Sequence, residues 1–308
     1  MALNTLEYAK IFQTALDKQI RENATTGWME ANAGQVQYNG GDEIKIPKMS
    51  LTGLGNYDRD NGFPQGAVTL SYETMKMTMD RGRTFQLDAM DVNETNFVAS
   101  AGTVMGEFQR LYVVPEIDAY RYSTIYTKAN EAGNVRTGYT PAVKDILTAL
   151  TEDIAKVEDK VGENVQLVIS MSIPARNILN QATGIERHID VADFKAGDIN
   201  MKVQRFNGIP IFGASSSVMK TAFDYDAGAS TTAGGFTPAS GALGINWLIM
   251  LQTAPIAVSK TEKIRIFAPD TNQHADAWKL DYRKYHDIWI PDNKLDAIYA
   301  CVGAAAKA

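Results

Sequence analysis

Apolar residues recur every three or four positions near the start of the chain, and this spacing predicts an amphipathic helix over residues 3–20. The apolar stripe consists of Leu3, Leu6, Ala9, Phe12, Leu16 and Ile20. The next segment, 21–42, is rich in small and polar residues and offers little for a core. We therefore expect an N-terminal helix followed by an arm, with the helix packed either on its own subunit or on a neighbouring molecule.

Alternating apolar and polar positions then predict a long β-hairpin over residues 43–82, with a turn rich in Gly, Asn and Asp at 53–66. In the return strand the apolar residues change parity, from Val68, Leu70 and Tyr72 to Met75, Met77 and Met79. The change predicts a β-bulge or a sharp twist near Glu73 and Thr74. An isolated two-stranded ribbon is only marginally stable in water, so we expect the hairpin to lie against another subunit.

A helical pattern covers residues 92–129, with Val104, Phe108, Leu111 and Tyr112 on one stripe. Pro115 lies in the middle of this pattern and predicts a kink, because proline removes a hydrogen bond and clashes with the preceding turn. A helix of this length is longer than a small domain is wide, so we expect an elongated molecule.

The second half of the chain alternates helical and strand signals, which predicts a mixed α/β domain. A helix follows the Thr140-Pro141 pair, a buried strand covers 165–169, a second helix covers 172–182, and further apolar runs lie at 209–212, 245–251, 256–258 and 264–267. Two last strands are predicted over 278–290 and 295–302. If these two strands pack with the long helix, the α/β domain is an insertion between two halves of a discontinuous domain.

Composition narrows the classes of function. The chain has 308 residues, 30 Lys+Arg against 36 Asp+Glu and a formal net charge of -6, without a basic cluster suited to gripping nucleic acid. One cysteine and three histidines exclude a structural zinc site and an intramolecular disulfide. We read no signal peptide, and the longest uncharged stretch, 227–259, is too interrupted to span a bilayer, so we expect a soluble protein folded in a reducing cytoplasm.

Candidate catalytic patterns are sparse. Ser217 and Lys220 fit the SxxK pattern of serine acyltransferases, but neither SDN nor KTG accompanies them. His286 lies in an aromatic strand, where a hydrogen-bonded structural histidine is the expected role, and the methionines at 75, 77 and 79 favour packing against a partner over a copper site. We therefore expect no enzyme activity, no catalytic residues, no metal and no cofactor.

Three segments carry a resemblance to a known family. Residues 107–121 (EFQRLYVVPEIDAYR) resemble its spine helix, residues 206–211 (FNGIPI) resemble a strand entry in its A-domain, and residues 254–290 are similar to its passage back into the P-domain sheet. The family is the major capsid protein of tailed double-stranded DNA phages (Caudoviricetes), of the Hong Kong 97 type. The resemblance extends over nearly the whole chain.

The resemblance implies an α+β fold with an N-arm at 1–42, an extended E-loop hairpin at 43–82, a P-domain at 83–136 and 268–308, and an inserted A-domain at 137–267. It implies a structural protein that self-assembles into hexamers and pentamers of an icosahedral head enclosing phage DNA. Its partners would be copies of itself together with portal, scaffolding and head-completion proteins, with weak non-specific contact to packaged DNA and no membrane. The protein would be assembled in the bacterial cytoplasm and located in the virion.

The expected contacts between subunits come from the arm and the hairpin. The candidate residues are Leu6, Phe12, Leu16, Tyr57, Arg59, Asp60, Met75, Met77 and Met79. Only about forty residues precede the hairpin, so we expect a separate scaffolding protein or none. Some relatives cross-link a lysine of the hairpin, but Lys45 and Lys48 lie near its base, and we expect a shell without covalent cross-links.

Three other interpretations remain open at this stage. An encapsulin-like nanocompartment would share the fold and differ in particle diameter. An SxxK acyl hydrolase would lose its activity in Ser217→Ala. A tail or head-completion protein would form rings or tubes instead of closed shells.

Overall fold

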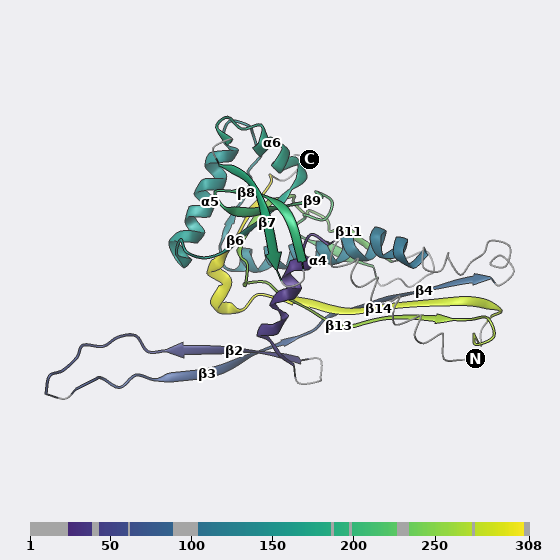
Figure 1. The fold of residues 1–308 in the computed structure, drawn as a ribbon, viewed down its shortest axis with the longest axis horizontal. Coiled ribbons are helices and arrows are strands. Elements are labelled where there is room, and N and C mark those ends of the chain that lie inside the picture. The colour runs from purple at the N-terminus through teal and green to yellow at the C-terminus, as the bar shows by residue number, and fades with distance from the viewer. Residues whose placement is uncertain are drawn as a thin grey trace.

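The computed structural model describes residues 24–38, 43–60, 62–88, 104–185, 188–196, 199–226, 234–272 and 275–304. The helix predicted over 3–20 and the first part of the helix predicted over 92–129 lie outside these residues. The described chain forms a body of helices and sheets from which a long hairpin projects on one side (Figure 1). The described residues form a mixed α+β fold with four separate sheets, which is the fold class that the sequence predicted.

The body is built on a seven-stranded sheet, in which the segments predicted as buried strands lie near the centre. Its strand order is β5 (Val135–Arg136), β15 (Ile298–Val302), β12 (Ile245–Leu251), β6 (Leu167–Ser172), β9 (Ile209–Ala214), β8 (Ile199–Phe206) and β7 (Ile189–Ala196). Every residue of β6 and β15 is buried. Such continuous apolar runs are typical of strands that are covered on both faces.

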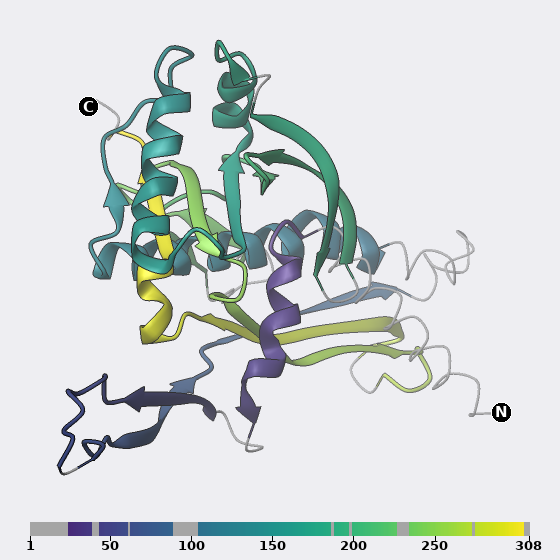
Figure 2. The ribbon, with the colours of Figure 1, turned by 60° about the vertical axis from the view of Figure 1, so that its left-hand side comes forward.

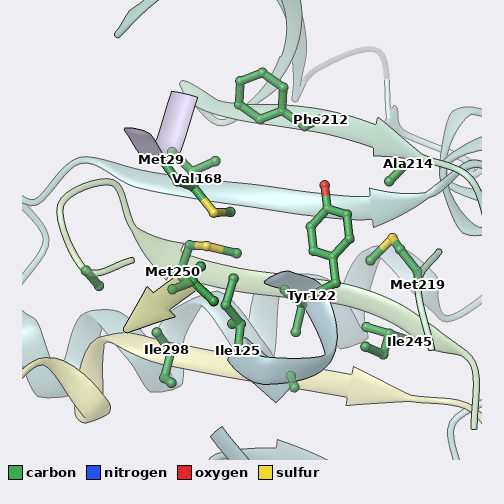
Figure 3. Close-up of a cluster of buried hydrophobic side chains, with 14 of the residues drawn as sticks. Met29, Tyr122, Ile125, Val168, Phe212, Ala214, Met219, Ile245, Met250 and Ile298 are labelled. Atoms are coloured by element: carbon green, nitrogen blue, oxygen red, sulfur yellow. The ribbon is translucent and has the colours of Figure 1, made fainter. Parts of the chain in front are cut away.

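Helices cover both faces of this sheet. The side chains of β12 alternate, so that Trp247 and Ile249 pack with α5 (Ile146–Val161) and α6 (Ile173–Asn180), while Leu248 and Met250 pack on the opposite face. The opposite face is covered by α4 (Val114–Glu131) and the 3-10 helix η1 (Gly27–Gln35). Figure 3 shows this second core, with Tyr122 and Ile125 of α4 lying against the sheet residues.

The long helix contains an irregular turn next to its proline. Residues 104–108 are α-helical, Gln109–Val113 form a π-helical turn (η2), and α4 continues from Val114 with Pro115 in its first turn. A π turn frees the backbone around a residue that cannot donate an amide hydrogen. The helix is therefore irregular next to Pro115, where it has a wider π turn, and the kink at Pro115 stays a prediction.

A three-stranded ribbon runs alongside α4 and consists of β13 (Ile256–Phe267), β14 (Ala277–Trp289) and β4 (Met79–Asp88) (Figure 1). The hairpin forms a separate sheet of β1 (Gln37–Tyr38), β2 (Glu43–Leu51) and β3 (Val68–Lys76). The predicted return strand is thus two strands, which belong to different sheets and meet at Met77 and Thr78.

The end of the chain departs from the predicted grouping. Residues Asp292–Ala297 form a 3-10 helix, η4, and β15 enters the large sheet between β5 and β12 instead of joining β14 in the ribbon. The sequence of β15, IYACV, is apolar at every position and is buried on both faces, which only an inner strand of a covered sheet provides. Earlier in the chain, β10 (Phe223–Tyr225) and β11 (Phe236–Pro238) pair as a short antiparallel hairpin, and residues 227–233 between them lie outside the described residues.

The described part of the predicted arm also departs from expectation, because it packs into the core of its own chain. Trp28 of η1 packs against two phenylalanines, with its ring centroid 6.3 Å from that of Phe194 and 6.0 Å from that of Phe212. Asn32 donates hydrogen bonds to the backbone carbonyls of Gln252 and Pro255. In Figure 2 this segment crosses the ribbon and contacts β13. The buried side chains of Trp28 and Met29, together with these hydrogen bonds, hold a largely polar segment on the core.

Candidate interaction surface

The outer half of the hairpin carries an exposed apolar face. Residues that are paired directly across an antiparallel hairpin point to the same side, and three apolar pairs follow one another here. They are Pro47 with Tyr72, Met49 with Leu70, and Leu51 with Val68. Leu51 and Val68 expose 65% and 69% of their surface. An apolar ladder of this kind on an extended ribbon is typical of a surface that another molecule covers. We call these six residues the outer ladder.

The opposite face of the same hairpin is polar far from the body and apolar near it. Lys48 pairs with Ser71 and Ser50 with Thr69, so the outer half of this face is hydrophilic. Near the base, by contrast, Ile46, Met75 and Met77 pack on Ile256 and Trp289 of the ribbon. The hairpin therefore changes its apolar face between base and tip.

This change of face explains the parity change in the return strand. The pairing of β2 with β3 runs from Glu43–Lys76 to Leu51–Val68 without a shift, so the predicted bulge near Glu73 and Thr74 is absent. The apolar residues change sides because the base is covered by the ribbon on one face, whereas the outer ladder lies on the other face. The prediction of a bulge was wrong for this reason.

The methionines of the return strand lie close to their own chain. Met77 is only 3% exposed and is packed in the cluster at the hairpin base, and Met75 and Met79 are half-buried. Met77 is thus unavailable for contact with a neighbour, contrary to the expectation for the whole row. Its flexible thioether fills the space between the two sheets.

The tip of the hairpin presents aromatic and charged residues together. The rings of Tyr57 and Phe63 are 5.0 Å apart, and Leu54 is fully exposed. Arg59 and Asp60 are exposed in the turn, where the Asp60 amide donates to Asp58 Oδ1 over 2.9 Å. Three of the predicted contact residues therefore lie at the tip and are accessible, whereas Leu6, Phe12 and Leu16 lie outside the described residues.

Partly buried polar contacts join the root of the hairpin to the body. The Asp287 carboxylate on β14 accepts hydrogen bonds from the Thr78 amide over 2.8 Å, the Thr78 hydroxyl over 3.0 Å and the Tyr120 hydroxyl over 2.7 Å. Burial and the charge of Asp287 raise the pKa of the Tyr120 hydroxyl, which therefore stays a donor. Farther out, Lys48 reaches Asp292 over 3.4 Å. These contacts hold the hairpin in a fixed position relative to the ribbon.

A second exposed apolar pair lies on the long helix, at Leu111 and Tyr112, which are 51% and 57% exposed. The sequence analysis placed both residues on the buried stripe of this helix. They fall in the π turn, whose wider spacing per turn interrupts the regular helical periodicity, although the ring of Tyr112 still stacks on that of Phe108 at 5.8 Å. Sequence periodicity could not reveal this exposure, since it assumes a regular helix.

The candidate catalytic pattern is not assembled. Ser217 Oγ shares a hydrogen bond of 2.8 Å with Ser215 Oγ, and no described hydrogen bond joins it to Lys220. Among the described residues, no group of three or more His, Cys, Asp or Glu side chains is placed to hold a metal ion. The helices in the described ranges are also too short or too polar to cross a membrane.

Comparisons with known proteins identify the fold. No protein-family model and no curated protein sequence matches the chain. Among solved structures, the mature capsid of bacteriophage PhiM1 matches with a TM-score of 0.57 at 10% identity, covering 88% of this chain and 84% of that one. The capsid of the cyanophage P-SCSP1u matches with a TM-score of 0.56 at 10% identity, covering 88% and 86%. A virus-like particle from Pyrococcus furiosus matches with a TM-score of 0.51 at 10% identity, covering 96% and 99%.

These likenesses extend over most of the chain. They show the fold of the chain, which is the one seen in these capsid and virus-like-particle structures. More particularly, the chain has the Hong Kong 97-type fold of phage capsid proteins, as its sequence resemblance implied.

Proposed function

We propose that this chain is a major capsid protein that self-assembles into the hexamers and pentamers of an icosahedral phage head enclosing DNA. The observation that carries the proposal is the outer ladder, an apolar face on a projecting hairpin in a chain with a capsid fold. Exposed apolar ladders and open strand edges are a liability for a monomer in water, because they favour association. In a closed shell, neighbouring copies bury both.

The structural divisions support a refined assignment of the domains. We assign the hairpin at 43–77 as the E-loop, and the ribbon with helix 104–131 as the P-domain. The seven-stranded sheet with α5 and α6 then forms the A-domain, which also takes in β15. The N-arm shortens to the residues before Ala24, because Ala24, Thr26, Trp28 and Met29 are buried against the rest of the chain.

The partners and location follow from this function. Copies of the chain would be the main partner, and portal, scaffolding and head-completion proteins would join them during assembly in the host cytoplasm. The finished protein would be in the virion, with only weak contact to packaged DNA because the net charge is -6. A structural role without enzyme activity fits the arrangement at Ser217, whose hydroxyl bonds to Ser215.

The test is expression of the chain alone, followed by size exclusion and negative-stain electron microscopy. We expect closed shells, capsomers or tubular polyheads. Leu70→Asp should abolish these assemblies while leaving the subunit folded, because Leu70 lies on the outer ladder beside Met49. Ser71→Asp is the matched control, since its side chain points to the opposite, polar face of the same strand. A compact monomer from the parent chain under all conditions, or equal assembly of both variants, would contradict the proposal.

A nanocompartment shell of the encapsulin type is the second candidate. It is favoured by the Pyrococcus furiosus virus-like particle, which the chain matches over 96% of its own length and 99% of that protein. Particle diameter separates the two functions in the same micrographs. Small uniform shells would support the nanocompartment, and larger heads would support the phage capsid.

A further inference from the structure

We propose that Arg81 of β4 is a positioning residue that clamps the short β10–β11 pair to the root of the hairpin, so that these two parts of the chain shift together. The inference goes beyond the proposed function and does not depend on it, because every contact involved lies within one chain. It assigns to one side chain the coupling between the projecting hairpin and a distant part of the body.

The first observation is the hydrogen bonding of the Arg81 guanidinium. Its Nε and Nη2 donate to the two carboxylate oxygens of Glu116, in the first turn of α4, over 2.6 Å and 3.3 Å. Its Nη1 donates to the Asp226 carbonyl over 2.8 Å, and its Nη2 also donates to the Gly235 carbonyl over 2.9 Å. These bonds use all but one of the N–H groups of an arginine, and they join β4 both to α4 and to the β10–β11 pair.

The second observation is the small size of the β10–β11 pair. Each strand has three residues, and a two-stranded ribbon this short is not stable by itself in water. Just beyond the last strand pair, the Asp226 amide donates to the Gly235 carbonyl over 3.2 Å. The carbonyls of these same two residues accept from Arg81, so its side chain holds the strands together where the chain leaves β10 and enters β11.

The surroundings of the guanidinium strengthen these bonds. The side chains of Arg81 and Glu116 are only 24% and 15% exposed, and hydrogen bonds between charged groups are stronger where water is largely excluded. The Arg81 Cζ atom also lies 5.8 Å from the ring centroid of Tyr225, within the range of a cation–π contact. A lysine would keep the charge, but its single ammonium group could not reach the carboxylate and both carbonyls together.

The third observation is a second route from the same strands to the hairpin root. The ring of Tyr225 meets that of Tyr120 edge-on at 5.9 Å. The Tyr120 hydroxyl donates to Asp287, which also accepts from the amide and hydroxyl groups of Thr78 at the root. Thr78 lies three residues before Arg81 in the chain, so these contacts form a closed ring. A displacement of the root therefore also displaces the side chain that holds β10 and β11.

The test is hydrogen–deuterium exchange of the full chain, read by mass spectrometry of peptides that cover β10 and β11, with all variants compared in the same oligomeric state. In Arg81→Gln we expect exchange in these strands to be roughly tenfold faster, as for the loss of a hydrogen bond from a charged donor. Arg81→Lys should also exchange faster, because charge alone does not hold both carbonyls. Arg283→Gln is the matched control, since Arg283 is an exposed arginine of the same ribbon that pairs with Asp80, and exchange in β10 and β11 should be unchanged.

Coupling to the root is measured by a double-mutant cycle with the same readout. Thr78→Val removes the hydroxyl that donates to Asp287. It should speed exchange in β10 and β11 in the parent chain, and by a smaller factor in the Arg81→Gln chain. Thr84→Val is the control, because it removes a similar hydrogen bond, to Asp281, farther along β4 and should leave exchange in β10 and β11 unchanged.

Other outcomes overturn the inference. Unchanged exchange in Arg81→Gln, or an equal increase in Arg283→Gln, would show that Arg81 does not hold the β10–β11 pair. Equal factors for Thr78→Val in both chains would show that the pair and the root are not coupled through Arg81. If Arg81→Gln does not fold, Glu116→Gln takes its place in both measurements, because it leaves Arg81 present and weakens only its ion pair. Exchange in β10 and β11 should again be faster, and an unchanged rate would refute the clamp.

Discussion

At the scale of single residues, the junction between hairpin and body contains a histidine that is kept neutral. His286 on β14 is buried beside Asp287, and its ring meets that of Tyr120 edge-on at 5.8 Å. Burial, and then the positive charges of Lys284, Arg121 and Arg81, lower the pKa of His286 well below 6.5. Its Nδ1 has no hydrogen-bond partner, so a proton there would be costly.

This environment predicts a pH dependence of stability. The folded chain keeps His286 neutral, whereas the unfolded chain binds a proton below pH 6.5, so the unfolding free energy should fall as the pH drops below 6.5. One such group contributes a slope of up to about 1.4 kcal/mol per pH unit. Chemical unfolding of His286→Phe should lack this part of the slope and run parallel to the parent above pH 7. Parallel curves over the whole range would contradict the prediction.

Residue-scale features were partly predictable. The strand position of His286 follows from the alternation over 278–290, and the structure confirms it. Its burial depends on Tyr120, which is 166 positions away in the chain, and on the hairpin root at Thr78. Contacts this distant in sequence leave no local periodic signal. The sequence therefore could not show that Nδ1 of this histidine lacks the hydrogen-bond partner that we expected for it.

At the scale of elements, one close backbone approach fixes the pairing of β4 with β14. Gly82 pairs with Arg283, and a Cβ at this position would lie 2.7 Å from the Tyr282 carbonyl oxygen. No real Cβ fits at that distance, so the strands can only be this close because residue 82 is glycine.

We predict that Gly82→Ala destabilises the chain by roughly 1–3 kcal/mol, as is usual when a side chain is forced into a packed site. Gly66→Ala is the control, because its Cβ would lie an ordinary 3.6 Å from Thr52 Cβ. Thermal unfolding of the two variants measures the difference. Equal unfolding temperatures would show that the ribbon accommodates the added methyl group.

Helices and strands were predicted correctly where one buried face sets their hydrophobic pattern. The helix at 146–161, the strand at 277–289 and the buried runs of the large sheet follow from regular periodicity. Two features escaped prediction because they depend on elements that lie far away in the sequence: the change of face in the hairpin and the position of β15. The exposure of Leu111 escaped prediction because the π turn departs from regular helical spacing.

At the scale of the whole molecule, the chain separates a self-contained body from a projecting hairpin. The body has cores on both faces of its sheet, while the outer ladder has no cover within the described chain. The sequence predicted a hairpin that needs a partner, since its apolar residues exceed what two strands can bury. It could not show which residues face that partner, because this requires the strand register.

We predict that assembled shells are held without covalent links between subunits. Lys48 pairs with Asp292 of its own chain over 3.4 Å, and the hairpin tip at 52–67 contains no lysine. A boiled denaturing gel of purified particles should therefore show one band at 33.7 kDa. Ladders of higher mass that survive boiling and reductant would refute this.

The change of apolar face along the hairpin also sets a rule for lengthening it. Because side chains alternate with a period of two, one residue inserted into β2 or β3 between base and outer ladder would turn the ladder towards the polar side. Two residues added to each strand would preserve both faces and only extend the reach. Foreign peptides are therefore best inserted within the tip at 52–67, where either parity leaves both strands intact, and insertions within a strand should be tolerated only in even numbers.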